Sequence, residues 1–210
     1  MTAKHRIAAL DWPRRFAEYS AGELARICGM SPEMQRLWRQ RGYLPEVQSA
    51  RARFSPTDVA EIIIRHALSR HGIPPSESAT IDPDAAKGAL YHAIINHQGS
   101  CEIIGPAGDV NAFLRDYELE DFALELAESP LRSNYLVWDD EKTMRMVDDV
   151  HELFDEQALA IAAIDLRVVG ARIMERGRKP IVTLESPLTA GLKRIRGLNG
   201  VVADALVTDQ

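Results

Sequence analysis

Three segments in the first third of the chain each carry the signals that begin an α-helix. Each opens on a serine, whose hydroxyl can accept from the free backbone N–H groups of a first helical turn, and in two of them proline follows at the first helical position, where its missing N–H costs nothing. The segments are Ser20-Ala21-Gly22-Glu23, Ser31-Pro32-Glu33-Met34 and Ser55-Pro56-Thr57-Asp58. Gly29, Gly42 and Gly72 follow as stops. The spacing predicts three helices, the first two joined by a turn of two or three residues, as a helix-turn-helix requires.

Apolar residues at helical spacing give each of these helices one face that can be buried. They are Leu24, Ile27 and Cys28 in the first, Met34, Leu37 and Trp38 in the second, and Val59, Ile62, Ile63 and Leu68 in the third. Residues 43–54, between the second and third helices, lack this pattern and are long enough for a small hairpin or wing. We interpret Trp38 and Phe54 as core residues rather than as stacking platforms.

Charge is distributed unevenly along the sequence. Residues 1–72 hold 12 Lys and Arg against 7 Asp and Glu, residues 73–175 hold 7 against 21, and residues 176–210 hold 6 against 3. Eleven of the first twelve cations are arginine. A basic N-terminal part followed by an acidic middle part indicates two different roles in one chain. The basic part is the candidate for binding a polyanion.

Composition excludes several classes of protein. The 210 residues, 46% hydrophobic and 27% charged, are enough for one large domain or two small ones. The longest apolar stretch, around Ala158–Ile164, is far short of the roughly 20 residues that cross a bilayer. Residues 1–10 contain no signal-type apolar run, and Cys28 and Cys101 are too far apart and too few for a disulfide framework or a cysteine zinc site. We therefore expect a reduced, cytoplasmic protein without a membrane segment.

The rest of the chain is predicted to contain both helices and strands. We expect helices over residues 83–98, 109–128 and, as the longest and most apolar, Phe154–Arg176, with strands at Cys101–Ile104, Tyr135–Trp138, Thr143–Val147 and Ile181–Leu184. The expected organisation is a basic leader over 1–18, a helix-turn-helix domain with a wing over 19–73, a linker over 74–84, a helical or α+β domain over 85–184 and a flexible tail over 185–210.

Residue patterns in the acidic part favour structural roles over chemical ones. His92 and His97 are badly spaced for one helix face, and the acidic residues between Asp139 and His151 resemble a solvated hairpin more than a Mg²⁺ or Ca²⁺ site. The segment Gly105–Asp109 precedes a helix and could cradle an anion, but it is not a phosphate-binding loop. No catalytic motif is present, so we expect no catalytic residues, no cofactor and no metal.

Residues 19–72 resemble the MerR-type winged helix-turn-helix family. The matching segments are Tyr19–Ala25, Gly29–Ser31, Arg36–Trp38, Arg41–Pro45, Arg53–Ser55 and Asp58-Val59. In that family the same order gives a helix, a tight turn, a recognition helix, an exit of Gly, Leu and Pro, a wing and a third helix. The resemblance covers about a quarter of the chain and does not extend to its C-terminal half. It implies a winged helix-turn-helix at the N-terminus. Together with the elements predicted from residue patterns beyond residue 83, this gives a mainly α fold, in which the winged helix-turn-helix precedes a mostly helical α+β domain with a long buried helix.

The sequence departs from the family pattern at four positions. Leu37 stands where the family has its first aromatic residue, and Arg39 stands where an acidic residue is usual. In the wing, Arg51 and Ala52 replace the usual Tyr-Arg pair, so Arg51 or Arg53 would have to take the phosphate-contacting role.

The second helix and the wing together supply the candidate DNA-contacting residues. Arginine suits bidentate contacts with guanine or phosphate, and glutamine can bridge an adenine edge. The candidates are Ser31, Gln35, Arg36, Arg39, Arg41, Arg51 and Arg53, with Glu33 on the same surface.

The resemblance makes a promoter-binding transcriptional regulator our first hypothesis. Its partners would be double-stranded DNA and a second copy of the chain. The two copies would be joined through the C-terminal domain and its Phe154–Arg176 helix. An effector or protein partner of unknown identity would complete the set. It would be cytoplasmic and associated with a bacterial nucleoid. Two alternatives stay open: a phage- or plasmid-type protein of DNA architecture, packaging or excision, and an interaction adaptor that works through its acidic surface.

Overall fold

The computed structural model describes residues 12–45, 52–78, 83–116, 119–129, 132–139, 144–153, 160–186 and 192–196. Its first half contains β1 (Arg14–Phe16), β2 (Tyr19–Ser20), α1 (Ala21–Cys28), α2 (Pro32–Gln40), β3 (Arg53–Phe54) and α3 (Pro56–Arg70). All three serine caps form as predicted: Ser20, Ser31 and Ser55 accept from the backbone N–H three residues on, at 3.3, 3.2 and 3.1 Å. Gly29 ends α1 in the left-handed conformation, with φ of 74°, which a residue with a Cβ rarely adopts.

The second half alternates helices and strands. It contains α4 (Pro83–Asn96), β4 (Cys101–Pro106), α5 (Ala107–Asp116), α6 (Leu119–Ala127), β5 (Tyr135–Asp139), β6 (Met144–Val147), the 3₁₀ turn η2 (Val150–Glu152), β7 (Ile161–Asp165), α7 (Leu166–Gly177), β8 (Val182–Glu185) and β9 (Leu192–Arg196). The predicted helix over 83–98 and the predicted strands of residues 101–147 are confirmed, apart from shifts of a few residues at their ends.

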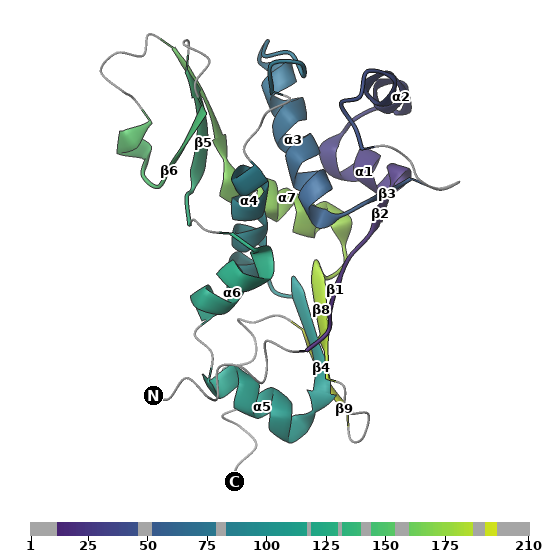
Figure 1. The fold of residues 1–210 in the computed structure, drawn as a ribbon, viewed down its shortest axis with the longest axis vertical. Helices are drawn as coiled ribbons and strands as arrows, with labels where there is room; N and C mark the ends of the chain where they lie inside the picture. The colour runs from purple at the N-terminus through teal and green to yellow at the C-terminus, as the bar shows by residue number, and fades with distance from the viewer. Residues whose placement is uncertain are drawn as a thin grey trace.

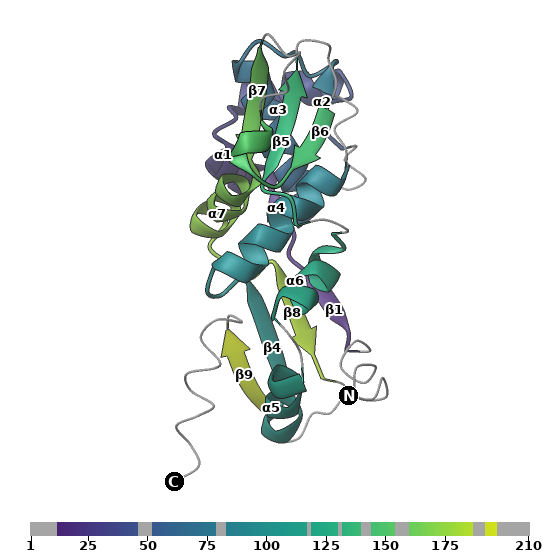
Figure 2. The same cartoon turned by 90° about the vertical axis from the view of Figure 1, so that its left-hand side faces the viewer.

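The strands form three sheets around a central group of helices. One sheet has the order β1-β8-β4-β9, with β4 and β8 parallel and the other neighbours antiparallel; the second is the antiparallel sheet β6-β5-β7; the third is the short pair β2-β3. Figures 1 and 2 show the four-stranded sheet with α5 at one end of an elongated molecule. The three-stranded sheet lies at the other end, where it flanks α3 and α4 on the side away from α2 (Figure 1).

Helices α4 and α7 cross at the centre of the molecule at very close range. A Cβ added at Gly170 of α7 would lie 2.6 Å from the carbonyl oxygen of Ala89 and 2.8 Å from the nitrogen of Ala93, both in α4. Glycine is required here because the two backbones touch. This crossing allows one continuous apolar core to run from Leu24 in α1 to Ile173 in α7.

Side chains also join the helix-turn-helix to α7 and its C-terminal end. Arg26 of α1 donates through Nε to the carbonyl of Arg176 at 2.8 Å, and Arg176 donates through Nη1 to the carbonyl of Ile27 at 3.3 Å. Lys179 donates to Glu23 Oε1 at 2.8 Å. The helix-turn-helix is therefore packed against a segment about 150 residues further along the chain.

The long buried helix predicted over Phe154–Arg176 is wrong in its first half. Residues 161–165 form β7, paired with β5, and the helix begins only at Leu166; residues 154–159 lie outside the described part. Asp165 caps α7 by accepting from the backbone N–H of Arg167 at 2.9 Å, a start signal that the apolar periodicity masked. Nor is α7 buried on all sides, since Val168 is 54% exposed.

Other segments also differ from expectation. The single helix predicted over 109–128 is two helices, α5 and α6. The segment expected to be a flexible tail contains β9, which pairs with β4, and the basic leader contains β1, which pairs with β8. Helices still hold more of the described residues than strands do, but three sheets make the fold α+β rather than mainly α.

Candidate nucleic-acid interface

The geometry of a helix-turn-helix is present at α1 and α2. Three residues, Gly29 to Ser31, separate the two helices. Gln35 fixes their relative position from inside: it is 4% exposed, and its Nε2 donates to the carbonyls of Ala21 at 3.2 Å and Met30 at 3.3 Å. The amide predicted to read an adenine edge is therefore used within the protein, and Gln35 does not belong to the exposed surface.

Trp38 anchors the middle of α2 to the core. It is 5% exposed and makes edge-on contacts with the rings of Tyr43 and His66, each at 6.1 Å between centroids. His66 lies within hydrogen-bonding distance of the carbonyl of Cys28, 3.1 Å from its Nδ1. Burial lowers the pKa of His66, more than this hydrogen bond raises it, so the ring is neutral and structural at pH 7. The interpretation of Trp38 as a core residue is confirmed.

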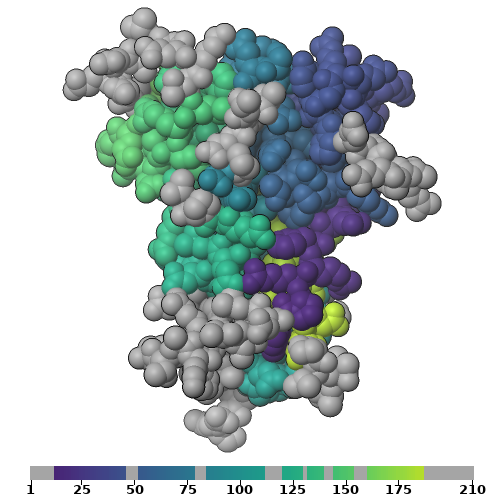
Figure 3. Space-filling model, in the orientation of Figure 1, coloured from purple at the N-terminus to yellow at the C-terminus, as the bar shows by residue number. Residues whose placement is uncertain are grey.

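The opposite face of α2 is exposed. Met34 and Leu37 are 37% and 42% exposed, so the predicted apolar stripe is wrong at both of these positions. Arg36 and Arg41 are also exposed, and neither side chain forms a hydrogen bond or ion pair with another described residue. α2 lies at the outer edge of the molecule, and it forms a corner at the upper right of the space-filling view (Figures 1 and 3). The helix thus offers cations and apolar atoms side by side.

Arg39 occupies a different environment on the same helix. It is half-buried, and its Nε and Nη2 atoms are shielded from solvent without a hydrogen-bond partner among the described residues. A desolvated guanidinium with unused donors is costly, and an anionic group brought to it would recover part of that cost. Arg39 is therefore a candidate anion contact on geometry as well as on sequence.

The base of the expected wing is built from β2 and β3. Tyr19 pairs with Phe54, and both side chains are fully buried, so the interpretation of Phe54 as core is confirmed. Arg53 is exposed and faces Glu18 at 3.6 Å, a distance that makes a weak surface ion pair. Arg51 and the rest of segment 46–51 lie outside the described residues.

Arg65 of α3 holds the chain where it leaves α2, a role that the sequence did not predict. Its Nη1 donates to the carbonyl of Tyr43 at 2.7 Å and its Nε to the carbonyl of Ser78 at 3.3 Å. One side chain of α3 therefore fixes the exit of α2 and the end of the loop that follows α3. The one sequence signal for this role is that Arg65 lies on a largely apolar helix, one turn after Glu61, with which it forms an ion pair.

Other candidate sites have structural explanations. His92 is buried with its Nε2 3.0 Å from the carbonyl of Ser133. Gly105 lies in β4 against Trp12, whose ring would meet an added Cβ at 2.8 Å, so this glycine makes room for an aromatic ring. Among the described residues no group of three or more His, Cys, Asp or Glu side chains could hold a metal ion. No helix in the described part of the chain is long and apolar enough to cross a membrane.

Comparison with known families identifies the region that contains this surface. Residues 19–83 match the model of the family described as MerR HTH family regulatory protein. The match covers the elements from β2 to the beginning of α4 and agrees with the resemblance in the sequence. Neither the curated proteins nor the solved structures gave a match.

Proposed function

We propose that the chain is a transcriptional regulator that binds promoter DNA through α2 and the wing that follows it. One observation carries the proposal: α2, the second helix of the helix-turn-helix, and its C-terminal cap present Arg36, Arg39 and Arg41, and none of the three forms an ion pair with another described residue. Gln35 and Trp38 hold this helix from the inner side, so exposed Arg36 and Arg41 and half-buried Arg39 are presented on a fixed scaffold.

The chemistry of the exposed face fits the major groove. A recognition helix lies in that groove and contacts base edges from its N-terminal part. There Arg36 would contact guanine or phosphate, Ser31 would contribute its hydroxyl, and Met34 with Leu37 would meet thymine methyl groups. Arg39 and Arg41, toward the other end of α2, would bind phosphates, as would Arg51 and Arg53 of the wing.

A homodimer would give this surface its sequence specificity. Two helices related by a two-fold axis read half-sites about 34–36 Å apart, so the bound site would be palindromic. The proposed dimer contact lies in the C-terminal part of the chain. The acidic balance of residues 73–175 supports this arrangement, because a surface of that charge is repelled by DNA and would be turned away from it.

Genome-wide footprinting of the tagged full chain in its native cell tests this function. We expect sharp palindromic peaks at promoters that disappear in the R36A/R39A variant and persist in R70A/R132A, which removes the same charge outside α2. Broad occupancy with strong bending and no promoter preference would favour the architectural alternative. A flat profile that neither variant changes would contradict DNA binding.

Exposed apolar atoms on α2 also favour a second candidate function, that of an interaction adaptor. Met34 and Leu37 could dock a partner protein as well as thymine methyl groups. The adaptor hypothesis predicts that M34S/L37S abolishes partner capture while R36A/R39A does not. The regulator hypothesis predicts that both double variants weaken DNA binding.

A further inference from the structure

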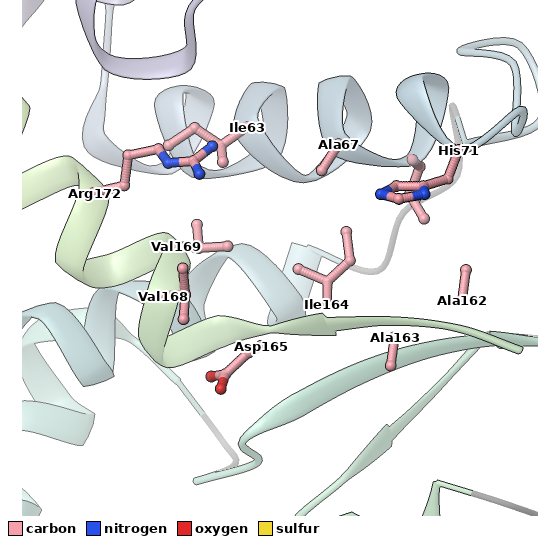
Figure 4. Close-up of a pocket in the computed structure, with 11 residues that line it drawn as sticks. Ile63, Ala67, His71, Ala162, Ala163, Ile164, Asp165, Val168, Val169 and Arg172 are labelled. Carbon is pink, nitrogen blue, oxygen red and sulfur yellow. The ribbon is translucent and has the colours of Figure 1, made fainter.

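A pocket lies between α3 and the junction of β7 with α7 (Figure 4). Its volume is about 190 Å³, and it is partly open to solvent. The side chains that line it include Ile63, Ala67 and His71 from α3 and its C-terminal end, Ile164 from β7, and Val169 and Arg172 from α7. None of them belongs to the proposed DNA surface.

The walls of the pocket are apolar over most of their length. Ile63, Ala67, Ile164 and Val169 provide aliphatic surface from both sides (Figure 4). An apolar cavity of about 150 Å³ is enough to hold a benzene ring. The pocket therefore has room for one ring or a short branched chain, and the alanine at position 67 is what keeps this space open.

One end of the pocket carries a cation without a partner. Figure 4 shows the guanidinium of Arg172 beside Ile63, and it forms no hydrogen bond or ion pair with another described residue. The nearby carboxylate of Asp165 does not neutralise it. That group accepts from Arg167 at 2.7 and 2.9 Å, and it points away from α3 in Figure 4.

The opposite end of the pocket carries an imidazole ring. The imidazole of His71 lies at the C-terminal end of α3, two turns beyond Ile63, and likewise has no side-chain partner in the described part of the chain. An apolar slot with an arginine at one end and an imidazole at the other is complementary to a small apolar molecule with one negative charge.

We propose that this pocket binds a small monocarboxylate with a single-ring or branched aliphatic body, its carboxylate paired with Arg172, and that its occupancy changes the affinity of the chain for DNA. The second half rests on the proposed function. The effect on DNA affinity follows from where the pocket lies. α3 belongs to the region that matches the regulatory family, whereas β7 and α7 lie outside it. A ligand that contacts both favours one placement of α3 over others.

Isothermal titration of the DNA-free full chain with benzoate tests the site. We expect saturable binding that R172M weakens by about tenfold or more, the loss expected for a charge-assisted pair. R70M, which removes a charge from the exposed end of α3, should leave binding unchanged. A67L should abolish it by filling the cavity, and circular dichroism of each variant checks that the fold is retained. Benzyl alcohol, equal in size but uncharged, should bind much more weakly than benzoate.

The outcomes separate the pocket from the proposed function. No binding of benzoate or cyclohexanecarboxylate at millimolar concentration, or equal binding by R172M, overturns the site. Binding that leaves DNA affinity unchanged at saturating benzoate overturns the effector role. The R36A/R39A variant, which should bind DNA much more weakly, should still bind benzoate as wild type does. Wild type that binds benzoate through Arg172 but binds no DNA would keep the site and contradict the regulator.

Discussion

Neighbouring side chains on α2 have opposite roles, and this decides what the helix can do. Gln35 and Trp38 point into the core, while Arg36 and Leu37 between them face solvent. The sequence placed Trp38 in the core, where the structure has it, but it placed Leu37 and Met34 inside and Gln35 outside. Such errors arise because a nine-residue helix has few turns, and its burial depends on which neighbours cover it. The amide of Gln35 can be buried because it donates to two carbonyls there.

Replacing Gln35 tests its structural role. Q35A removes the side-chain donor that reaches the carbonyls of Ala21 and Met30 and leaves a cavity inside the helix-turn-helix, so we expect a loss of about 1–3 kcal/mol in the free energy of unfolding. Urea denaturation measures this loss. R36A, on the exposed side, should stay within about 0.5 kcal/mol of wild type. A stable Q35A with an altered base preference would instead place Gln35 at the DNA.

The contact between Glu23 and Lys179 predicts a pH dependence of stability. Burial alone would raise the pKa of Glu23, but hydrogen bonds from Lys179 and Ser20 lower it to about 2. A carboxylate whose pKa is lower in the folded state stabilises the fold above its unfolded value and loses this contribution as pH falls. We therefore expect wild type to be more stable than K179M at neutral pH. The difference should shrink from pH 4.5 toward pH 2.

Urea unfolding of wild type and K179M across this range measures the effect. E23Q serves as the control, because without a titrating group at residue 23 its stability should vary less with pH. Parallel curves for wild type and K179M would show that the ion pair contributes nothing to stability.

At the scale of elements, local signals predicted the first half of the chain better than the second. Serine caps and glycine stops fixed α1, α2 and α3 because both signals act within one turn of the backbone. β7 and β9 exist through partners distant in sequence: β7 pairs with β5, and β9 pairs with β4. Ile161 to Ile164 suits either a strand or a buried helix, and only the pairing with β5 decides between them.

The close crossing of α4 and α7 predicts that even a small substitution at Gly170 lowers the stability of the fold. G170A introduces a methyl group against the backbone of α4, at a distance that real Cβ atoms do not tolerate, so the helices must separate. We expect a loss of about 1–3 kcal/mol in the free energy of unfolding, although alanine favours helix formation. Thermal denaturation measures it.

G108A in α5 provides the matched control. Nothing lies within 4 Å of a Cβ added at Gly108, so this variant should be neutral or more stable. Equal effects of the two substitutions would contradict the close crossing of α4 and α7.

At the scale of the whole molecule, the proposed DNA surface and the C-terminal part share one core. Tyr19, beside the helix-turn-helix, packs against Gly177, and α7 contacts both α1 and α3. The predicted linker over 74–84 does not separate two cores, because α3 before it and α4 after it pack together. Charge and the caps predicted a basic, helical N-terminal part, but no local signal reports contacts made across 150 residues.

If Arg36 and Arg39 of α2 bind DNA, their loss weakens binding in a salt-dependent way, and a titration of DNA binding across a salt series measures this. Fluorescence anisotropy with a duplex from a footprinted promoter would compare wild type, R36A/R39A and the charge-matched R70A/R132A. We predict that R36A/R39A loses about 1–3 kcal/mol of binding free energy for each base-contacting arginine, and that each lost phosphate contact lowers the slope of log K against log salt by about 1. R70A/R132A should stay close to wild type. If R36A/R39A binds as tightly as wild type throughout the salt series, these two arginines of α2 do not bind DNA.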